Sequence, residues 1–166
     1  MPESDEIFFK WSNEYSVGIP TIDEQHQELV NMLNRLFIAV SKREGTKAVA
    51  GILDALVDYT QTHFALEERL MEAAKYPDIA HHKLEHKKLI EKLDHLSKKF
   101  MLEEKPIYFE LLSFLRTWLR EHIQDCDKKY SNNLRQAGFS TQAWEQDAKA
   151  AFTSMAEKTG RWWKIW

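Results

Sequence analysis

Apolar residues recur at spacings of three and four along four long stretches of this chain, which is the period of an α-helix with one buried side. The pattern predicts helices over about residues 21–41, 46–74, 78–101 and 106–134. Glycine and proline are scarce and fall between these stretches, as expected of residues that begin or end helices. Because the connections are short, neighbouring helices should run antiparallel. We therefore expect an all-α, up-down-up-down four-helix bundle.

A fifth helical stretch follows Gly138 and differs from the first four. Its apolar residues keep helical spacing over about residues 140–158. They are Trp144, Ala148, Ala151, Phe152 and Met155. At 166 residues the chain is long enough for one domain with a real core. We expect a bundle over 1–137, with an N-terminal arm at 1–20, and an amphipathic C-terminal extension over 138–166.

Composition narrows the class of protein. Charged residues make up 30% of the chain and the formal net charge is -3, which is typical of a soluble globular protein and gives no reason to expect nucleic-acid binding. The single cysteine, Cys126, cannot form an internal disulfide. The N-terminus is acidic, unlike a secretory signal, and no apolar run approaches the roughly 20 residues that cross a bilayer. These features favour the cytoplasm.

Histidines interrupt the apolar stripes of all four predicted bundle helices. They are His26, His63, His82, His86 and His122. A buried histidine needs a hydrogen-bond partner or a metal to replace its lost hydration, and a lone one is usually a satisfied core residue. Five together are harder to explain in that way. His63 and Glu67 are one helical turn apart, as are His82 and His86, so each pair can share one ion.

Spacing alone does not identify the second carboxylate. Asp127 lies five residues after His122, and an ideal α-helix would rotate its side chain roughly 140° away. Asp127 reaches the site only if it leans back or if the helix is deformed there, and Asp125 is the competing candidate. The same periodicity places His81, His95 and Glu68 outside the site, as exposed residues.

The ordered set of His26, His63-x-x-x-Glu67, His82-x-x-x-His86 and His122-x-x-x-x-Asp127 resembles the hemerythrins, in particular their single-domain bacterial members, the bacteriohemerythrins. The likeness covers about residues 8–137. It includes the approach Trp11-Ser12-x-x-Tyr15-Ser16-Val17-Gly18-Ile19, followed by Ile22-Asp23-x-Gln25. It implies a metal-binding four-helix bundle in which all seven ligand positions have a match.

The resemblance also implies a cofactor of two iron ions with dioxygen as the ligand. One iron would take His82, His86 and His122, and the other His26 and His63. Glu67 and Asp127 would bridge the irons beside an oxo or hydroxo group. Two octahedral irons offer twelve positions, and this set leaves one open, on the iron with two histidines. Trp118, Leu119 and Ile123 match residues of the family's oxygen pocket, although they also fit a plain bundle core.

The expected function is reversible dioxygen binding for storage or delivery, without enzymatic turnover. One alternative is an oxygen or redox sensor that signals through a partner, and another is a di-iron enzyme with weak peroxidase or oxidase activity. Ferritin-like oxidases bind their metal ions with paired Glu-x-x-His motifs and a carboxylate-rich ligand set. This chain has no paired Glu-x-x-His motifs, and its candidate ligands are mostly histidines. Zinc is disfavoured because structural zinc sites close with four ligands.

Tryptophan is concentrated after Gly138, where Trp144 is followed by Trp162, Trp163 and Trp166. One interpretation is that the fifth helix and the last tryptophans cover apolar surface of the bundle. The other is that the cluster docks on a membrane surface or a protein partner, since tryptophan and arginine are enriched at such boundaries.

Overall fold

The computed structural model describes residues 7–102 and 107–158, and this part of the chain is helical, with no strand. Its long helices are α1 (Pro20–Ser41), α2 (Thr46–Ala73) and α3 (Ile79–Leu102). The fourth rod is built from α4 (Tyr108–Glu121), a π-helix η2 (His122–Asp127) and α5 (Lys128–Gln136). The extension forms α6 (Thr141–Lys158), and a short 3₁₀ turn, η1 (Asn13–Tyr15), precedes α1. The predicted helices are confirmed, with ends that differ by one or two residues.

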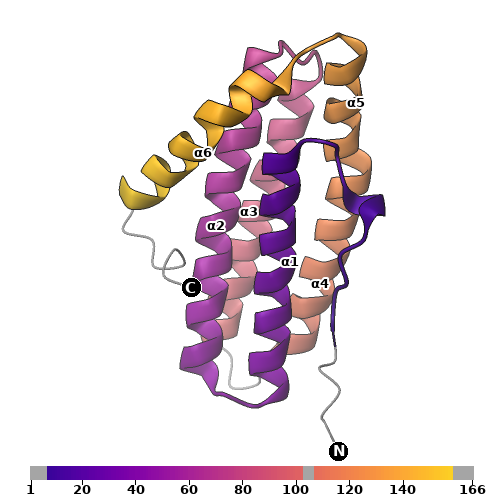
Figure 1. Ribbon diagram of the computed structural model, residues 1–166. Helices are drawn as coiled ribbons and strands as arrows, with labels where there is room; N and C mark the ends of the chain where they lie inside the picture. The colour runs from indigo at the N-terminus through magenta and orange to yellow at the C-terminus, as the bar shows by residue number, and fades with distance from the viewer. Residues whose placement is uncertain (1–6, 103–106, 159–166) are drawn as a thin grey trace, which may run out of the picture.

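The four rods run alternately up and down, side by side (Figure 1). Helix α1 lies between α2 and α4, and α2 also packs on α3. Leucines from all of them fill the centre, including Leu36, Leu70, Leu93 and Leu111, each at most 1% exposed. The bundle axis is therefore the core of the protein, and the fold class expected from the sequence is confirmed.

The N-terminal arm runs along the outside of the bundle beside α4 (Figure 1). Asn34 on α1 anchors it, because its side-chain amide accepts a hydrogen bond from the Phe9 N–H and donates one to the Phe9 carbonyl, both at 2.9 Å. Phe8 stacks on Phe37, with ring centroids 4.8 Å apart. The arm thus covers apolar surface of α1 before the chain enters that helix.

Helix α6 crosses α2 obliquely and also reaches α1 (Figure 1). Ala148 is buried against the bundle, and Phe152 meets Tyr59 of α2 edge to face at 5.4 Å. Glu145 accepts a hydrogen bond of 2.9 Å from the backbone N–H of Thr21, at the start of α1. The described part of the extension therefore packs on the bundle, whereas Trp162, Trp163 and Trp166 lie outside the described residues.

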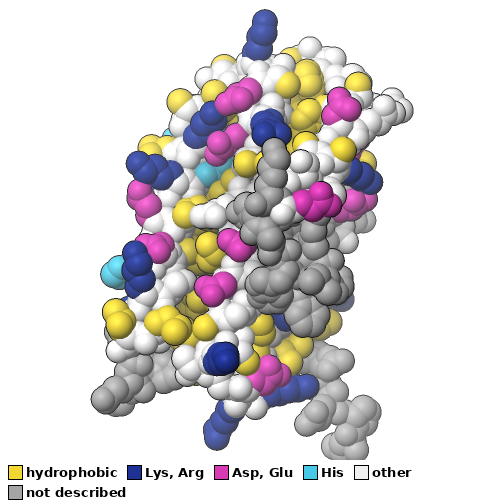
Figure 2. All heavy atoms as spheres, turned by 90° about the vertical axis from the view of Figure 1, so that its left-hand side faces the viewer, with side chains coloured by type: hydrophobic (Ala, Val, Ile, Leu, Met, Phe, Trp, Pro, Cys, Tyr) yellow, Lys and Arg dark blue, Asp and Glu magenta, His cyan; other side chains and the backbone are white. Residues whose placement is uncertain are grey.

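The face of the molecule on the side of α2 and α6 mixes acidic, basic and hydrophobic side chains (Figure 2). Within residues 7–102 and 107–158, every helix is too short or too polar to span a lipid bilayer.

Candidate metal centre

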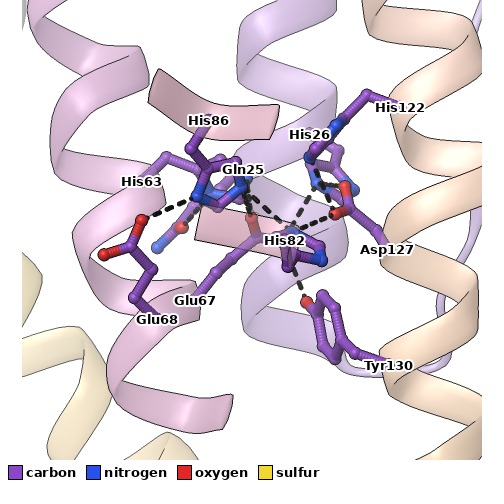
Figure 3. Close-up of polar contacts among 10 residues, drawn as sticks. All are labelled: Gln25, His26, His63, Glu67, Glu68, His82, His86, His122, Asp127 and Tyr130. Carbon is purple, nitrogen blue, oxygen red and sulfur yellow. Dashed lines mark hydrogen bonds and ion pairs between the residues drawn. The ribbon is translucent and has the colours of Figure 1, made fainter. Parts of the chain in front are cut away.

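Seven polar side chains meet inside the bundle, and each of the four rods contributes to them (Figure 3). Helix α1 contributes His26, α2 His63 and Glu67, α3 His82 and His86, and η2 His122 and Asp127. None of the seven is more than 6% exposed. The structure therefore brings together every residue that the sequence nominated as a metal ligand.

The donor atoms form two groups that share Glu67. One group contains His82, His86, His122, Asp127 and Glu67, and the other contains His26, His63 and Glu67. Within each group the donor atoms lie within 4.8 Å of one another, which is close enough for one ion to contact them all. The groups hold three and two histidines respectively, which is the unequal division that the family resemblance implies.

Asp127 lies between the two groups. Its Oδ2 is 3.1 Å from Nε2 of His26, and its Oδ1 is 3.2 Å from Nε2 of His82 and 3.1 Å from Nε2 of His122. One carboxylate oxygen thus faces each group, and this geometry suits a carboxylate that bridges two cations.

Glu67 also contacts both groups. Its Oε2 lies 3.5 Å from Nε2 of His63 and 3.3 Å from Nε2 of His86. Its Oε1 accepts a hydrogen bond of 2.9 Å from the hydroxyl of Tyr130, which is fully buried. The phenol fixes the orientation of a carboxylate that would otherwise rotate.

Asp127 reaches the centre because the helix is deformed. Residues His122–Asp127 form a π-helix, in which one additional residue fits into the turn. The wider turn brings residue i+5, and not i+4, onto the face of residue i. Cys126, four residues after His122, is only half-buried, and Asp127 takes the inward position.

Helical periodicity excluded His81, His95 and Glu68 from the site and left Asp125 as an alternative to Asp127. His81 and His95 are exposed, as predicted, and Asp125, the competing candidate for the second carboxylate, is exposed as well. The prediction for Glu68 was wrong, because its side chain is only 28% exposed and its Oε1 lies 2.9 Å from Nδ1 of His86. Helical phase identifies the residues of the inner face but does not show how far a long side chain at its edge can reach.

Two more polar side chains contact the cluster without having been predicted as part of it. Gln25 accepts a hydrogen bond from Nδ1 of His63, with the two atoms 2.7 Å apart, and Tyr130 binds Glu67 as described above. Sequence position could have pointed to both residues, since Gln25 precedes His26 and Tyr130 lies three residues after Asp127. Neither spacing indicates which partner the side chain meets.

Burial and the two carboxylates shift the histidine pKa values in different directions. Burial disfavours the charged form of His26, but Asp127 and Glu67 outweigh it and raise its pKa to about 9. The pKa of His122 rises to about 10, because Asp127 likewise outweighs burial. Burial dominates at His63 and lowers its pKa to about 4. Without a cation, the raised pKa values keep His26 and His122 protonated at neutral pH, next to the two carboxylates.

The donor set fits a pair of transition-metal ions. Nε2 of His26, Nε2 of His122, Oε2 of Glu67 and both carboxylate oxygens of Asp127 are buried without a hydrogen-bond partner. An unpaired buried polar group costs about 1–3 kcal/mol. Imidazole nitrogen with some carboxylate oxygen is a set that iron accepts readily. Cations between these atoms would remove that penalty.

A small apolar cavity of about 20 Å³ lies among the four helices of the bundle. It is lined by Leu29, Leu33, Leu56, Thr60, Leu89, Leu93, Leu115, Trp118 and Leu119. Four of these residues stand three positions from a histidine of the cluster, one on each rod, so the cavity is about one helical turn away. Trp118 also stacks on His122 at 4.5 Å. Ile123 is fully buried but does not line the cavity.

Fold and site together define a four-helix bundle with a histidine-rich centre for two cations. The model of the hemerythrin HHE cation binding domain matches residues 17–133. The bacteriohemerythrin of Stenotrophomonas maltophilia is 38% identical over 125 residues, which are 75% of this chain and 80% of the relative. Myohemerythrin-1 of Phascolopsis gouldii is 31% identical over 126 residues, covering 76% and 94% of the two chains.

A crystal structure of wild-type hemerythrin superposes with a TM-score of 0.69 at 34% identity, covering 75% of this chain and 95% of the other. The chain belongs to the hemerythrin family.

Proposed function

We propose that this protein binds dioxygen reversibly at two iron ions and serves in oxygen storage or delivery. The observation that supports this most is the unequal pair of donor groups, with three histidines on one side, two on the other and both carboxylates between them. With two carboxylates and one oxo or hydroxo group shared between octahedral ions, three histidines would fill the sixth position of an ion and two would leave it open. The unequal groups leave the ion at His26 and His63 with fewer protein ligands.

The protein side chains have separate tasks in this proposal. His82, His86 and His122 would hold one iron, His26 and His63 would hold the other, and Glu67 and Asp127 would offer carboxylate oxygens to both. When bound, a pair of ferrous ions supplies the electrons and the free coordination position that reversible dioxygen binding requires. Tyr130 holds Glu67 in place, and burial of all seven ligands keeps bulk water and larger reductants away.

The cavity among the four helices suits a small apolar gas. Its lining is leucine with Thr60 and Trp118, and the Thr60 hydroxyl donates a 2.7 Å hydrogen bond to the Leu56 carbonyl on its own helix. A volume of about 20 Å³ is enough for roughly one water-sized molecule. Trp118 and Leu119 of this lining, with Ile123 in the adjoining core, are the proposed oxygen pocket.

Two of the relatives are named bacteriohemerythrin and myohemerythrin. On the basis of this family likeness, we propose a binding protein and not an enzyme.

A sensor is the second candidate. Its support is the hydrogen bond from Thr21 to Glu145, which joins α6 to α1 five residues before His26, so a shift of His26 has a path to the surface. The cytoplasm remains the proposed location, on the basis of the single cysteine.

Spectroscopy tests the proposal. Ferrous protein prepared under argon should gain iron charge-transfer absorption bands in air and lose them again when returned to argon, over several cycles. The metal-free protein taken through the same cycles is the control and should show no such bands. A single irreversible oxidation would contradict reversible dioxygen binding, and steady turnover with an added reductant would indicate an enzyme.

A further inference from the structure

Two histidines of the centre donate hydrogen bonds to side chains outside the ligand set. Nδ1 of His63 lies 2.7 Å from Oε1 of Gln25, and Nδ1 of His86 lies 2.9 Å from Oε1 of Glu68 (Figure 3). An amide oxygen and a carboxylate oxygen only accept hydrogen bonds, so Nδ1 carries the hydrogen in both rings. In the neutral form that binds a metal ion, each ring then offers the lone pair of its Nε2 to the centre.

The two acceptors differ in charge and in setting. Gln25 is a neutral amide, 6% exposed, on α1. Glu68 is a carboxylate on α2 whose side chain is 28% exposed. A carboxylate attracts the Nδ1 hydrogen more strongly than an amide does, and so makes the opposite nitrogen a stronger electron donor.

The two histidines also belong to different donor groups. His63 stands with His26, whereas His86 stands with His82 and His122. The neutral partner therefore serves the group with two histidines, and the anionic partner serves the group with three. The group that already has more nitrogen donors is the one that Glu68 makes richer in electrons.

From this pairing we infer that Gln25 and Glu68 are positioning residues that make the two iron ions unequal in redox behaviour. Glu68 favours the ferric state of the iron at His82, His86 and His122. Gln25 orients His63 without adding charge, and so keeps the iron at His26 and His63 easier to return to the ferrous state. The inference rests on the proposed function, since it assigns a purpose to both irons.

A purely structural role predicts something different. The Gln25 contact ties α1 to α2 and the Glu68 contact ties α2 to α3, so both could be bonds between helices and nothing more. Glutamine and glutamate have nearly the same size and shape, and exchanging them changes the charge while the acceptor remains. Exchange would then alter stability without a consistent effect on the redox equilibrium.

The test uses Gln25→Glu and Glu68→Gln in the iron-loaded protein, with the ferrous-to-ferric equilibrium measured against mediator dyes of known potential. Gln25→Glu should shift this equilibrium toward ferric by about tenfold, the order of magnitude by which outer hydrogen-bond partners change metal affinity. Glu68→Gln should shift it toward ferrous. Autoxidation in air should be faster in the first variant and slower in the second.

Matched controls exchange the same residue types on exposed surface nearby. The controls are Gln27→Glu, two residues after Gln25, and Glu72→Gln, one turn after Glu68. Glu72 pairs with Lys83 on the surface. Each control changes the net charge by the same amount as its test variant and should leave the redox equilibrium unchanged. A shift in a control equal to that in its test variant would reduce the effect to net charge and overturn the inference.

Iron content and circular dichroism identify variants that fail to load or fold. Gln25→Glu buries a charge, and if that variant does not fold, Glu68→Gln decides the matter alone. A folded Glu68→Gln protein with both irons and no shift toward ferrous would overturn the inference. Failure of the proposed function would look different, because the unmodified protein would then lack two irons or a reversible response to air.

Discussion

His122 and Asp127 are five residues apart in the chain, yet Nε2 of the histidine lies 3.1 Å from Oδ1 of the aspartate. A regular α-helix would point these side chains in different directions. The π-helix from His122 to Asp127 brings them to one face, and π-turns of this kind are frequent at functional sites. A local deformation of the fourth rod is what completes the ligand set.

Asp127→Asn tests this deformation directly. The change keeps the shape but removes the charge that faces both donor groups, so iron affinity should fall by more than the about 10–100-fold typical for losing an outer hydrogen-bond partner of a ligand. Asp125→Asn removes the same charge from an exposed residue two positions away and should leave affinity unchanged. Competition with a chelator measures both. Equal losses in the two variants would show that the inward position of Asp127 is irrelevant to iron binding.

Three histidine variants test the assignment of ligands. His63→Ala should abolish the response to air while most of the helical circular dichroism remains, because one donor of the less-filled group is lost. His81→Ala and His95→Ala should keep the visible spectrum of the unmodified protein, since both residues are exposed. Loss of the spectrum in either of these controls would contradict the placement of the centre.

Helical periodicity predicted the four rods and six of the seven ligands, because buried side chains on α-helices must follow a period near 3.6 residues. The fifth helix could be predicted on the same basis. Asp127 could not, since its position depends on a π-turn that the spacing does not reveal. It was nominated only through the family resemblance.

The partners of the ligands were harder to predict from sequence. Gln25 meets His63 across two helices, and Glu68 reaches His86 from the edge of α2. These contacts depend on how the helices are rotated against each other and on side-chain rotamers. A one-dimensional pattern contains neither quantity, which explains why Glu68 was wrongly expected to be exposed.

Iron binding should depend on pH in a defined direction. The pKa values of His26 and His122 in the metal-free centre are raised to about 9 and about 10, and a metal ligand must be a neutral imidazole. Iron must therefore displace the protons of His26 and His122, and its affinity should rise between pH 6 and pH 9. Chelator competition at several pH values measures this. An affinity that stays constant after correction for the chelator would contradict the protonation of these residues.

The same shifts predict the stability of the metal-free protein. Groups whose pKa is raised from 6.5 on folding stabilise the fold fully below pH 6.5, and this contribution is lost as the pH rises through the folded-state values. The melting temperature of the metal-free protein should thus fall from pH 7 to pH 10. The iron-loaded protein should show a smaller decrease over this range, because its histidines are already deprotonated.

Glu145 on α6 should stabilise the start of α1. The residue before that helix, Ile19, has no side chain able to cap it, and Glu145 accepts the Thr21 N–H instead. Glu145→Ala should lower the free energy of unfolding by about 1 kcal/mol, as for loss of a helix cap. Gln146→Ala, at an exposed neighbour, is the control. Urea denaturation compares the two, and identical midpoints would show that the contact adds no stability.

Metal analysis of the purified protein tests the central claim most directly. Two irons per chain, lost together in Asp127→Asn and retained in Asp125→Asn, is the result that seven inward donors in two unequal groups predict. A single zinc ion per chain, or an iron content that neither variant alters, would contradict it.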